Sequence, residues 1–502
     1  MSIFPYVLVL MALITNPVAG LTKTEIKVHK VNPRTEYQDF KGFGTSLAWF
    51  GNAIGGFTEP NRTRLMDLLF DKDKGLGLNV LRYNIGGGDA PDCKHNKKSG
   101  ETHMRDFGNM PGYSPKKGVW DWNADAGQRW VLQAAKQRLG NELVVEAFSN
   151  APPYWMTKSQ CNAGAKIKGK NNLHEDHFEN FADYLTEVVK HFRDHWGIHF
   201  YSLEPMNEPK MDWGAGGLQE GNSFTIPTQE KLIKAVKAKM IKKGLGSVRL
   251  TAMDESSVDK AIKAYNGYDK EAQSYIQKLN THGYWGTPAE QDQLRDIARR
   301  DGHELWQSES DGSGNPNPFD PRPFDTESMV SVIELSTRIR THLQHLRPTA
   351  WVFWQAIENY AQMIREDVNW GLIVANFEPE GTFGLAAEEW KIHKKFYAMA
   401  QYSKFIRKGS TMIAMDGKQG VAFLDKKSNK LILVLTNENK NSMTSSFDLS
   451  DFKTTASTVK VYRTSPDETL KNLKDIKIKD KSFSMNLLPR SITTFVIAEA
   501  AL

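Results

Sequence analysis

The pattern of hydrophobic and polar positions changes at about residue 408. Before that point, short apolar runs recur along the chain, and each run is nearly continuous rather than alternating. Continuous apolar runs of this length are typical of parallel strands that are buried on both faces. We therefore predict eight strands, over residues 40–48, 78–85, 143–150, 200–207, 247–253, 276–283, 304–309 and 350–356.

The segments between these runs have helical periodicity. In the clearest one, apolar side chains recur every three or four residues on one face, and charged residues occupy the other face. The apolar positions of this helix are Phe178, Phe181, Leu185, Val188, Phe192 and Trp196. Eight strands that alternate with helices predict an α/β fold, a (β/α)8 TIM barrel, over residues 39–407.

Beyond residue 408 the apolar runs become shorter and alternate with polar positions. The runs 420–424, 431–435, 459–462 and 491–497 are separated by turn sequences such as Asp416-Gly417. This spacing predicts an antiparallel β-sandwich over residues 408–502. Residues 21–38 alternate in the same way, so we expect them to add N-terminal strands to that sandwich.

Residues 1–20 do not fit the globular pattern. They contain no charged residue, an apolar run over 7–14, and the small residues Ala19-Gly20 at the end. Spanning a bilayer takes about 20 apolar residues, whereas a run of this length suits a secretory signal peptide. The start lacks the usual Lys or Arg, and a buried strand or a membrane anchor are the other interpretations. We expect a signal peptide over 1–20 and a secreted, extracellular protein without stable membrane insertion.

Composition and net charge exclude a disordered chain and argue against a nucleic-acid partner. Hydrophobic residues make up 40% of the chain and charged residues 25%, which excludes a disordered protein. The net charge of +6 is small for 502 residues, and we interpret the lysine clusters as solvated faces. We therefore expect no nucleic-acid partner. We also expect a monomer, although neither charge nor composition determines the oligomeric state. A weak, salt-sensitive attraction to an acidic polysaccharide stays open.

Two kinds of covalent modification are suggested by single residues. Cys93 and Cys161, the two cysteines, fall in loops on the predicted active face, where they either form a disulfide or remain free thiols. Asn61-Arg62-Thr63 is a glycosylation sequon with Asn61 as the acceptor. His95 and His103, near Cys93, lack the spacing of metal ligands, so we expect no metal.

The candidate catalytic groups follow two predicted strands. The fourth strand ends in Glu204-Pro205-Met206-Asn207-Glu208-Pro209, and the seventh in Leu305-Trp306-Gln307-Ser308-Glu309. Loops at the carboxyl ends of barrel strands converge on one site, and two carboxylates about 5–5.5 Å apart suit a retaining glycosidase. Either glutamate could instead cap a helix or form a salt bridge. Glu204 is the main competitor of Glu208, and we interpret it as structural.

Several motifs occur in a fixed order along the chain. They are Gly42-Phe43-Gly44, Leu81-Arg82-Tyr83-Asn84-Ile85-Gly86-Gly87, Ala151-Pro152-Pro153-Tyr154-Trp155-Met156, Asn207-Glu208-Pro209, Trp306-Gln307-Ser308-Glu309 and Tyr402-Ser403-Lys404-Phe405-Ile406-Arg407. This series resembles glycoside hydrolase family 30 over essentially the whole chain after residue 20. The resemblance implies a retaining hydrolase that needs no cofactor, with a sandwich built from both termini. It also implies Glu208 as acid/base and Glu309 as nucleophile.

Within that family the third strand end is distinctive. Phe148-Ser149-Asn150 resembles the endo-β-1,6-galactanase group, as do Gly88-Asp89-Ala90-Pro91 and Gln219-Glu220-Gly221-Asn222. Glucosylceramidase-like members carry Ser-Pro-Trp there, so Asn150 replaces a stacking indole with an amide that could bind the axial 4-hydroxyl of galactose. The resemblance implies internal cleavage of β-1,6-galactan, the side chains of arabinogalactan. Exo-acting galactosidase variants, a β-1,6-glucanase, a glucosylceramidase-like hydrolase and a non-catalytic carbohydrate-binding protein remain alternatives, and endo or exo action is left open by the sequence.

Further polar residues are candidates for support of the two carboxylates. Arg82 could keep Glu309 ionised through a charge-assisted hydrogen bond, which would lower the pKa of Glu309. Asn207 could bind the sugar 2-hydroxyl, and His282 and Tyr284 could orient the nucleophile or contact the sugar. A structural ion pair, a backbone-bonded turn and ordinary core packing are the respective alternatives.

Three more residues are candidates for sugar contacts. Trp155 and Trp354 could each stack on the apolar face of a sugar, or could pack in the barrel. Asp89 could bind sugar hydroxyls, or could form a turn in its Gly-rich loop.

Overall fold

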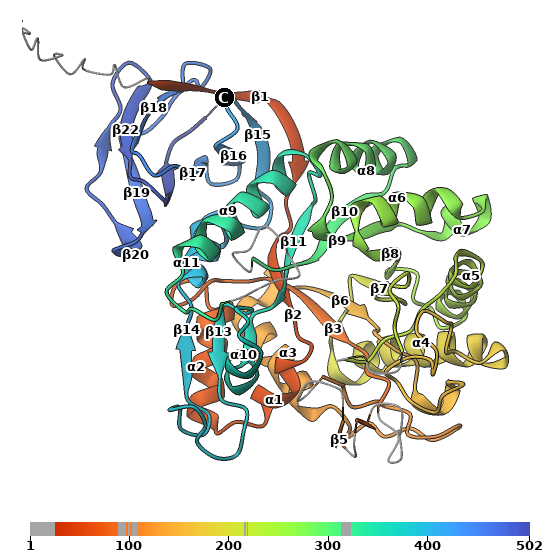
Figure 1. Ribbon diagram of the computed structural model, residues 1–502. Helices are drawn as coiled ribbons and strands as arrows, with labels where there is room; N and C mark the ends of the chain where they lie inside the picture. Colours follow the sequence, from red (N-terminus) through yellow and green to blue (C-terminus); the bar gives the residue numbers. More distant parts are fainter. Residues whose placement is uncertain are drawn as a thin grey trace, which may run out of the picture.

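Parallel strands close into a barrel at the centre of the computed structural model, which describes residues 26–88, 97–98, 101–102, 108–214, 217, 219–312 and 323–501 (Figure 1). Each strand pairs with the next along the chain, and β11 pairs with β2 to complete the ring. The predicted (β/α)8 barrel is therefore confirmed, with every predicted strand present. In order around the barrel the strands are β2 (Gly42–Ser46), β3 (Val80–Asn84), β6 (Val144–Phe148), β7 (Ser202–Glu204), β8 (Arg249–Ser257), β9 (Lys278–Trp285), β10 (Glu304–Ser310) and β11 (Ala350–Gln355).

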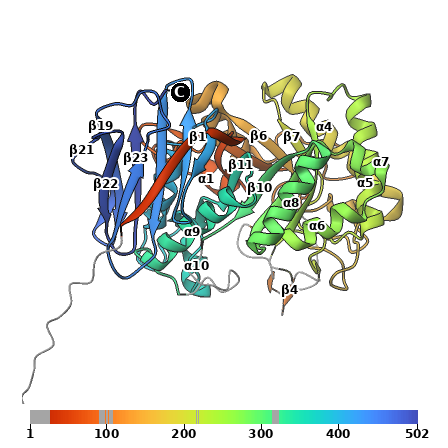
Figure 2. The same ribbon diagram turned by 90° about the horizontal axis from the view of Figure 1, so that it is seen from above.

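Helices surround the barrel (Figure 2). The helix expected over residues 178–196 is α4, with Phe181, Leu185 and Phe192 buried. The described helices are α1 (Phe50–Gly55), α2 (Glu59–Phe70), α3 (Ala126–Leu139), α4 (Phe178–Trp196), α5 (Ile226–Lys242), α6 (Val258–Gly267), α7 (Lys270–Tyr275), α8 (Pro288–Asp301), α9 (Met329–Gln344), α10 (Tyr360–Glu366) and α11 (Lys395–Ser403). None of these described helices is long and apolar enough to cross a bilayer.

Local sequence explains where helix α8 begins and ends. The Thr287 hydroxyl accepts a hydrogen bond from the Glu290 N–H, and the Glu290 carboxylate accepts one from the Thr287 N–H. This reciprocal capping satisfies two backbone donors that the first turn of a helix leaves free. Gly302 ends the helix at φ +73°, a left-handed conformation that glycine adopts without steric cost.

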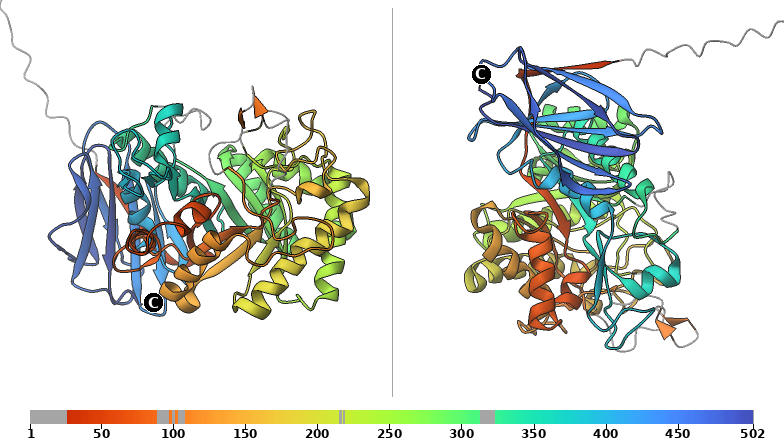
Figure 3. Two further views of the ribbon diagram at one scale, coloured as in Figure 1. Left: turned by 90° about the horizontal axis from the view of Figure 1, so that it is seen from below. Right: turned by 90° about the vertical axis from the view of Figure 1, so that its left-hand side faces the viewer.

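Strands from both ends of the described chain form the second domain (Figure 3). The first strand, β1, pairs with β15 in antiparallel fashion and with β18 in parallel, so the N-terminal segment is held between C-terminal strands. The strands are β1 (Lys27–Asp39), β15 (Thr411–Met415), β16 (Gly420–Asp425), β17 (Lys430–Asn437), β18 (Met443–Asp448), β19 (Thr458–Ser465), β20 (Glu468–Asn472), β21 (Ile476–Lys477), β22 (Ser482–Leu487) and β23 (Ser491–Ile497).

One face of this domain packs against the barrel. Along β17, Leu431, Leu433 and Leu435 belong to the sandwich core, whereas Ile432 and Val434 join the hydrophobic core of the barrel domain. Hydrogen bonds reinforce the junction, including one of 2.6 Å between the hydroxyls of Ser336 on α9 and Thr436 on β17. The apolar run of β17 is continuous because both of its faces are buried.

Short elements complete the described structure. A small sheet joins β12 (Ile357–Asn359), β13 (Ile373–Ala375) and β14 (Trp390–Ile392), and β4 (Lys97–Lys98) pairs with β5 (Glu101–Thr102). Single turns of 3-10 helix occur at η1 (Gly140–Glu142), η2 (Tyr154–Met156) and η3 (Glu175–His177). The sequence pattern predicted none of these short elements, because segments of two or three residues have no measurable periodicity.

Candidate active site

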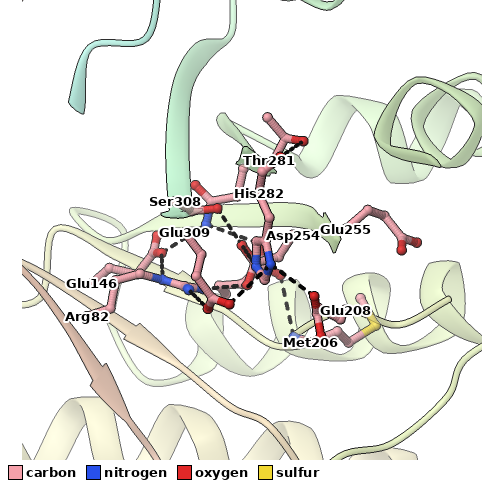
Figure 4. A network of polar contacts seen from close by, with 12 residues as sticks. Arg82, Glu146, Met206, Glu208, Asp254, Glu255, Thr281, His282, Ser308 and Glu309 are labelled. Carbon is pink, nitrogen blue, oxygen red and sulfur yellow. Dashed lines mark hydrogen bonds and ion pairs between the residues drawn. The ribbon is translucent and has the colours of Figure 1, made fainter. Parts of the chain in front are cut away.

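Two carboxylates and one imidazole meet at the carboxyl end of the barrel (Figure 4). Nδ1 of His282 lies 3.2 Å from Oε1 of Glu208 and 3.3 Å from Oε1 of Glu309. One oxygen of each glutamate and a ring nitrogen of His282 all lie within 4.8 Å of one another. The structure thus brings together the two glutamates that the sequence singled out, with one oxygen of each within 4.8 Å of the other. Retaining glycosidases typically hold their two carboxyl groups about 5–5.5 Å apart.

A buried guanidinium lies beside Glu309. Nη1 of Arg82 donates to Oε2 of Glu309 at 3.1 Å, its Nε donates to Glu146 at 3.0 Å, and its Nη2 pairs with Asp254. Burial alone would lower the pKa of Arg82, but the charges of Asp254, Glu146 and Glu309 raise it above the ordinary value. Arg82 is therefore a fixed positive charge next to Glu309.

The acidity of Glu309 differs from the sequence-based expectation. Arg82 was expected to lower the pKa of Glu309, and both Arg82 and His282 act in that direction. Burial is the larger effect, and it raises the pKa of Glu309 to about 7, with a further contribution from the negative charge of Glu208. The predicted influence of Arg82 is therefore present, and the net shift is upward because the carboxyl group is removed from water.

Asp254 links both glutamates, and the sequence analysis missed it. Its Oδ1 accepts a hydrogen bond from the Ser308 hydroxyl at 2.7 Å and lies 3.3 Å from Nε2 of His282. Its carbonyl oxygen accepts a hydrogen bond from the Glu208 N–H at 2.9 Å. The sequence did contain a signal for Asp254, because this acidic residue directly follows the predicted strand 247–253, as Glu208 directly follows the predicted strand 200–207.

The charges around His282 favour its imidazolium form. Burial acts to lower the pKa of His282, but the neighbouring charges of Glu309 and Asp254 raise it well above its ordinary value. Burial would likewise raise the pKa of Asp254, yet Arg82 and His282 lower it. We therefore interpret Glu208, His282 and Glu309 as an acid–base cluster.

We expect Asp254→Asn to lower the free energy of unfolding by about 3 kcal/mol, because it removes a buried negative charge from Arg82 and His282. Urea denaturation measures this loss. Asp475→Asn, the same change at an exposed site, serves as control. A loss below about 1 kcal/mol would show that Glu146 and Glu309 are sufficient partners for Arg82.

Tyr284 contacts the Glu309 oxygen that Arg82 does not contact. Its hydroxyl donates to Oε1 of Glu309 at 3.2 Å. Burial, followed by the charges of Glu309 and Glu208, raises the pKa of Tyr284 well above its ordinary value. The phenol therefore stays protonated and acts as a hydrogen-bond donor.

Two asparagines offer acceptors at the neighbouring strand ends. Within the described residues, Oδ1 of Asn207 and Oδ1 of Asn150 are buried without a hydrogen-bond partner. Asn150 donates through Nδ2 to Glu220 at 3.2 Å. Glu204, interpreted as structural, is fully buried and accepts a hydrogen bond of 3.3 Å from Asn280 inside the barrel.

Comparison with known proteins decides the family. The model of O-glycosyl hydrolase family 30 matches residues 25–364. The chain belongs to glycoside hydrolase family 30. It is accordingly an O-glycosyl hydrolase, as the sequence motifs implied.

Relatives of this family 30 hydrolase include two enzymes named for β-1,6-galactosyl substrates. It is 29% identical to an endo-β-1,6-galactanase of Hypocrea rufa, over 94% of this chain and 95% of that protein. It is 26% identical to an exo-β-1,6-galactobiohydrolase of Bifidobacterium longum subsp. longum, over 69% of this chain and 29% of that protein. A crystal structure of a conserved exported protein from Bacteroides fragilis has the same fold, with a TM-score of 0.80 and 22% identity, over 94% of this chain and all of that one.

The two candidate tryptophans of the family 30 hydrolase lie in different places. Trp354, on β11, packs edge-on against Trp49, with ring centroids 5.1 Å apart, in a cluster that includes Phe148. Phe148 also stacks under the Arg82 guanidinium, so Trp354 lies close to the acid–base cluster. Trp155 donates through its Nε1 to the Ser114 carbonyl and lines a separate cavity of about 230 Å³.

The remaining candidates concern loops and modification. Asp89 and Cys93 lie outside the described residues. Cys161 is disulfide-bonded. Asn61 lies in α2, where its Nδ2 donates to Glu388 at 2.8 Å, so a glycan on this nitrogen would disturb an existing hydrogen bond.

Proposed function

We propose that this family 30 hydrolase cleaves β-1,6-linked galactosyl units of galactan, as in arabinogalactan side chains, by a retaining double displacement. The observation that carries the mechanism is the close approach of Glu208 and Glu309, with His282 in contact with both. The similarity to two enzymes named for β-1,6-galactosyl substrates supports the choice of sugar and linkage.

In the first step the Glu309 carboxylate attacks the anomeric carbon. The bond from that carbon to the glycosidic oxygen breaks, and Glu208 gives its proton to the departing oxygen. Arg82 and Tyr284 hold the two oxygens of Glu309 by hydrogen bonds, which orients the carboxylate for attack. The product of this step is a galactosyl ester of Glu309.

In the second step water hydrolyses the ester. Glu208 removes a proton from the water, the water oxygen bonds to the anomeric carbon, and Glu309 leaves as a carboxylate. The positive charges of Arg82 and His282 stabilise the carboxylate as it reappears. Two inversions at the same carbon give net retention.

Hydrolysis of de-arabinosylated arabinogalactan tests this function, with β-1,6-glucan and a glucosylceramide assayed alongside. We expect β-1,6-galacto-oligosaccharides as products, and the first product in NMR spectra should be the β-anomer. An initial α-anomer would contradict the retaining mechanism. Cleavage of the glucan in place of the galactan would leave the two carboxylates in their roles and overturn the choice of sugar.

The charge of His282 leads to a pH prediction. The imidazolium favours the ionised form of Glu309, so His282→Asn should raise the pKa of Glu309 further. Because Glu309 must be ionised to attack, the acidic limb of the kcat/KM profile should move to higher pH, by about one pH unit or more.

The pH dependence of kcat/KM for galactan measures this shift. His345→Asn is a matched control, because His345 pairs with Asp292 outside the site. A limb that stays in place, or moves to lower pH, would show that His282 carries no charge in the free enzyme.

We also propose that residues 1–20 are removed on secretion. The uncharged apolar segment and its small terminal residues support this proposal. N-terminal sequencing of the protein recovered from the culture medium should begin at Leu21. Retention inside the cell with Met1 present would overturn it.

A further inference from the structure

A buried carboxyl group outside the acid–base cluster accepts hydrogen bonds from several asparagine side chains. Glu220 lies between β7 and α5 and is fully buried. Its Oε1 accepts hydrogen bonds from Nδ2 of Asn84 at 2.5 Å and from Nδ2 of Asn150 at 3.2 Å. Nδ2 of Asn162 lies 3.5 Å from its Oε2. Three amides from separate segments of the chain therefore converge on one side chain.

The same three amides each leave a carbonyl oxygen without a donor. Within the described residues, Oδ1 of Asn84, Asn150 and Asn162 is buried and accepts no hydrogen bond. Each of the three asparagines turns its Nδ2 toward the Glu220 carboxyl group, so each amide presents its NH2 group to Glu220. Each carbonyl is thereby turned away from Glu220. Native proteins leave few buried acceptors unsatisfied, which points to a ligand that brings its own donors.

The position of these amides places them at the substrate end of the barrel. Asn84 is the last residue of β3, two residues after Arg82, and Asn150 follows β6. The Ser149 carbonyl, next to Asn150, accepts a hydrogen bond of 3.0 Å from the Asn207 N–H, so the third and fourth strand ends are tied together. A sugar held at Glu208 and Glu309 lies beside these strands.

We propose that Glu220 is a positioning residue that sets sugar specificity, because it holds the buried amides of Asn84 and Asn150 at strand ends beside the acid–base cluster, and a galactosyl hydroxyl that reaches either carbonyl oxygen meets an acceptor that no group within the described residues satisfies. Hydroxyl groups are donors that an apolar ligand lacks, and a hydrogen-bonding site discriminates strongly among ligands that differ in such groups. This proposal rests on the proposed function, since it names the substrate contacts of that same site.

Glu220→Gln tests the proposal. Oε1 of Glu220 accepts from Asn84 and Asn150, and Oε2 accepts from Asn162 and the Met110 N–H. A glutamine amide has one oxygen in place of two, so it cannot accept at both positions and the cluster must rearrange. We expect KM for de-arabinosylated galactan to rise about 10-fold, with kcat within about threefold, because ground-state binding is lost while the acid–base cluster is untouched. Glu220→Asp, which keeps the charge on a shorter side chain, should raise KM by a smaller factor.

Glu304→Gln is the matched control. Glu304 is also a carboxylate held by several donors, including Trp306 Nε1 at 2.7 Å and the Thr349 hydroxyl at 2.6 Å. It lies at the opposite, amino-terminal end of β10. We expect Glu304→Gln to leave KM unchanged, because residues at the amino-terminal end of a barrel stabilise the fold and do not contact the substrate.

A double-mutant cycle with Asn150→Leu shows whether the KM increase of Glu220→Gln arises through Asn150. If Glu220 acts through Asn150, the KM increase of the double variant should be smaller than the product of the two single increases. Multiplicative effects, or an unchanged KM in both Glu220→Gln and Glu220→Asp, would overturn the proposal. Absence of galactan hydrolysis by the unaltered enzyme would instead reject the proposed function. Should Glu220→Gln fail to fold, Glu220→Asp and its KM decide the question.

Discussion

We expect Glu309→Gln to lower the turnover of β-1,6-galactan by about 10⁴-fold or more, because the amide cannot attack the anomeric carbon. The change preserves shape, because the amide oxygen can accept the hydrogen bond from Arg82 while the amide NH2 group faces the Tyr284 hydroxyl, which can accept from it. Initial rates with saturating galactan measure the loss. Glu204→Gln is the control, because burial raises the pKa of Glu204 well above its ordinary value and glutamine resembles the neutral acid. Its turnover should stay within about tenfold of the unaltered enzyme.

Azide distinguishes the role of Glu309 from a loss of structure. In Glu309→Ala the cavity left by the side chain admits azide to the face from which the carboxylate attacks. One displacement by azide should give the α-galactosyl azide, the product of a single inversion. A β-galactosyl azide, or turnover of Glu309→Gln close to that of the unaltered enzyme, would show that another residue is the nucleophile.

The second large effect is expected at Glu208. Glu208→Gln should lower the turnover of galactan by about 10²–10⁴-fold, because the alkoxide leaving group departs poorly without a proton. An aryl β-galactoside with an acidic phenol should be affected far less in its first step, since its phenolate needs no proton. The galactosyl ester should then accumulate and be visible by mass spectrometry as a covalent adduct of the protein.

The product formed with azide also separates the two glutamates. In Glu208→Ala, azide takes the place of the activated water in the second step, so the β-galactosyl azide should form. Equal loss of activity on galactan and on the aryl galactoside would contradict the role of Glu208 as acid. His282 pairs with both glutamates, and its own replacement should change the pH profile without selecting between the substrates.

Much of the fold could be predicted because the barrel strands are buried on both faces. Such strands read as continuous apolar runs, and the structure places β3, β6 and β11 within the predicted ranges. In the sandwich, β18 and β22 were missed because serine, threonine and asparagine occupy their exposed positions. Their hydrophobic side chains are too few to distinguish a strand from a loop.

The candidate site was partly predictable for a related reason. Glu208 and Glu309 follow apolar runs, and strand ends converge in a barrel. Asp254 was missed because the apolar run ends at Met253, whereas β8 continues to Ser257 with its polar side chains buried in the barrel mouth. The position of Trp155 could not be predicted, because its hydrogen bond to the Ser114 carbonyl joins segments that no local pattern connects.

The pairing of β1 between β15 and β18 also has a consequence for folding during synthesis of the chain. The hydroxyl of Thr411 bonds to Asp39 across 372 residues of sequence, so β1 leaves the ribosome long before its partners exist. At about 5–20 residues per second, this interval lasts about 20–75 s. Throughout it the nascent chain carries a strand with open edges, which is a hazard for association between chains on one polysome. Slow elongation or early termination within the sandwich should therefore favour aggregation over a folded barrel.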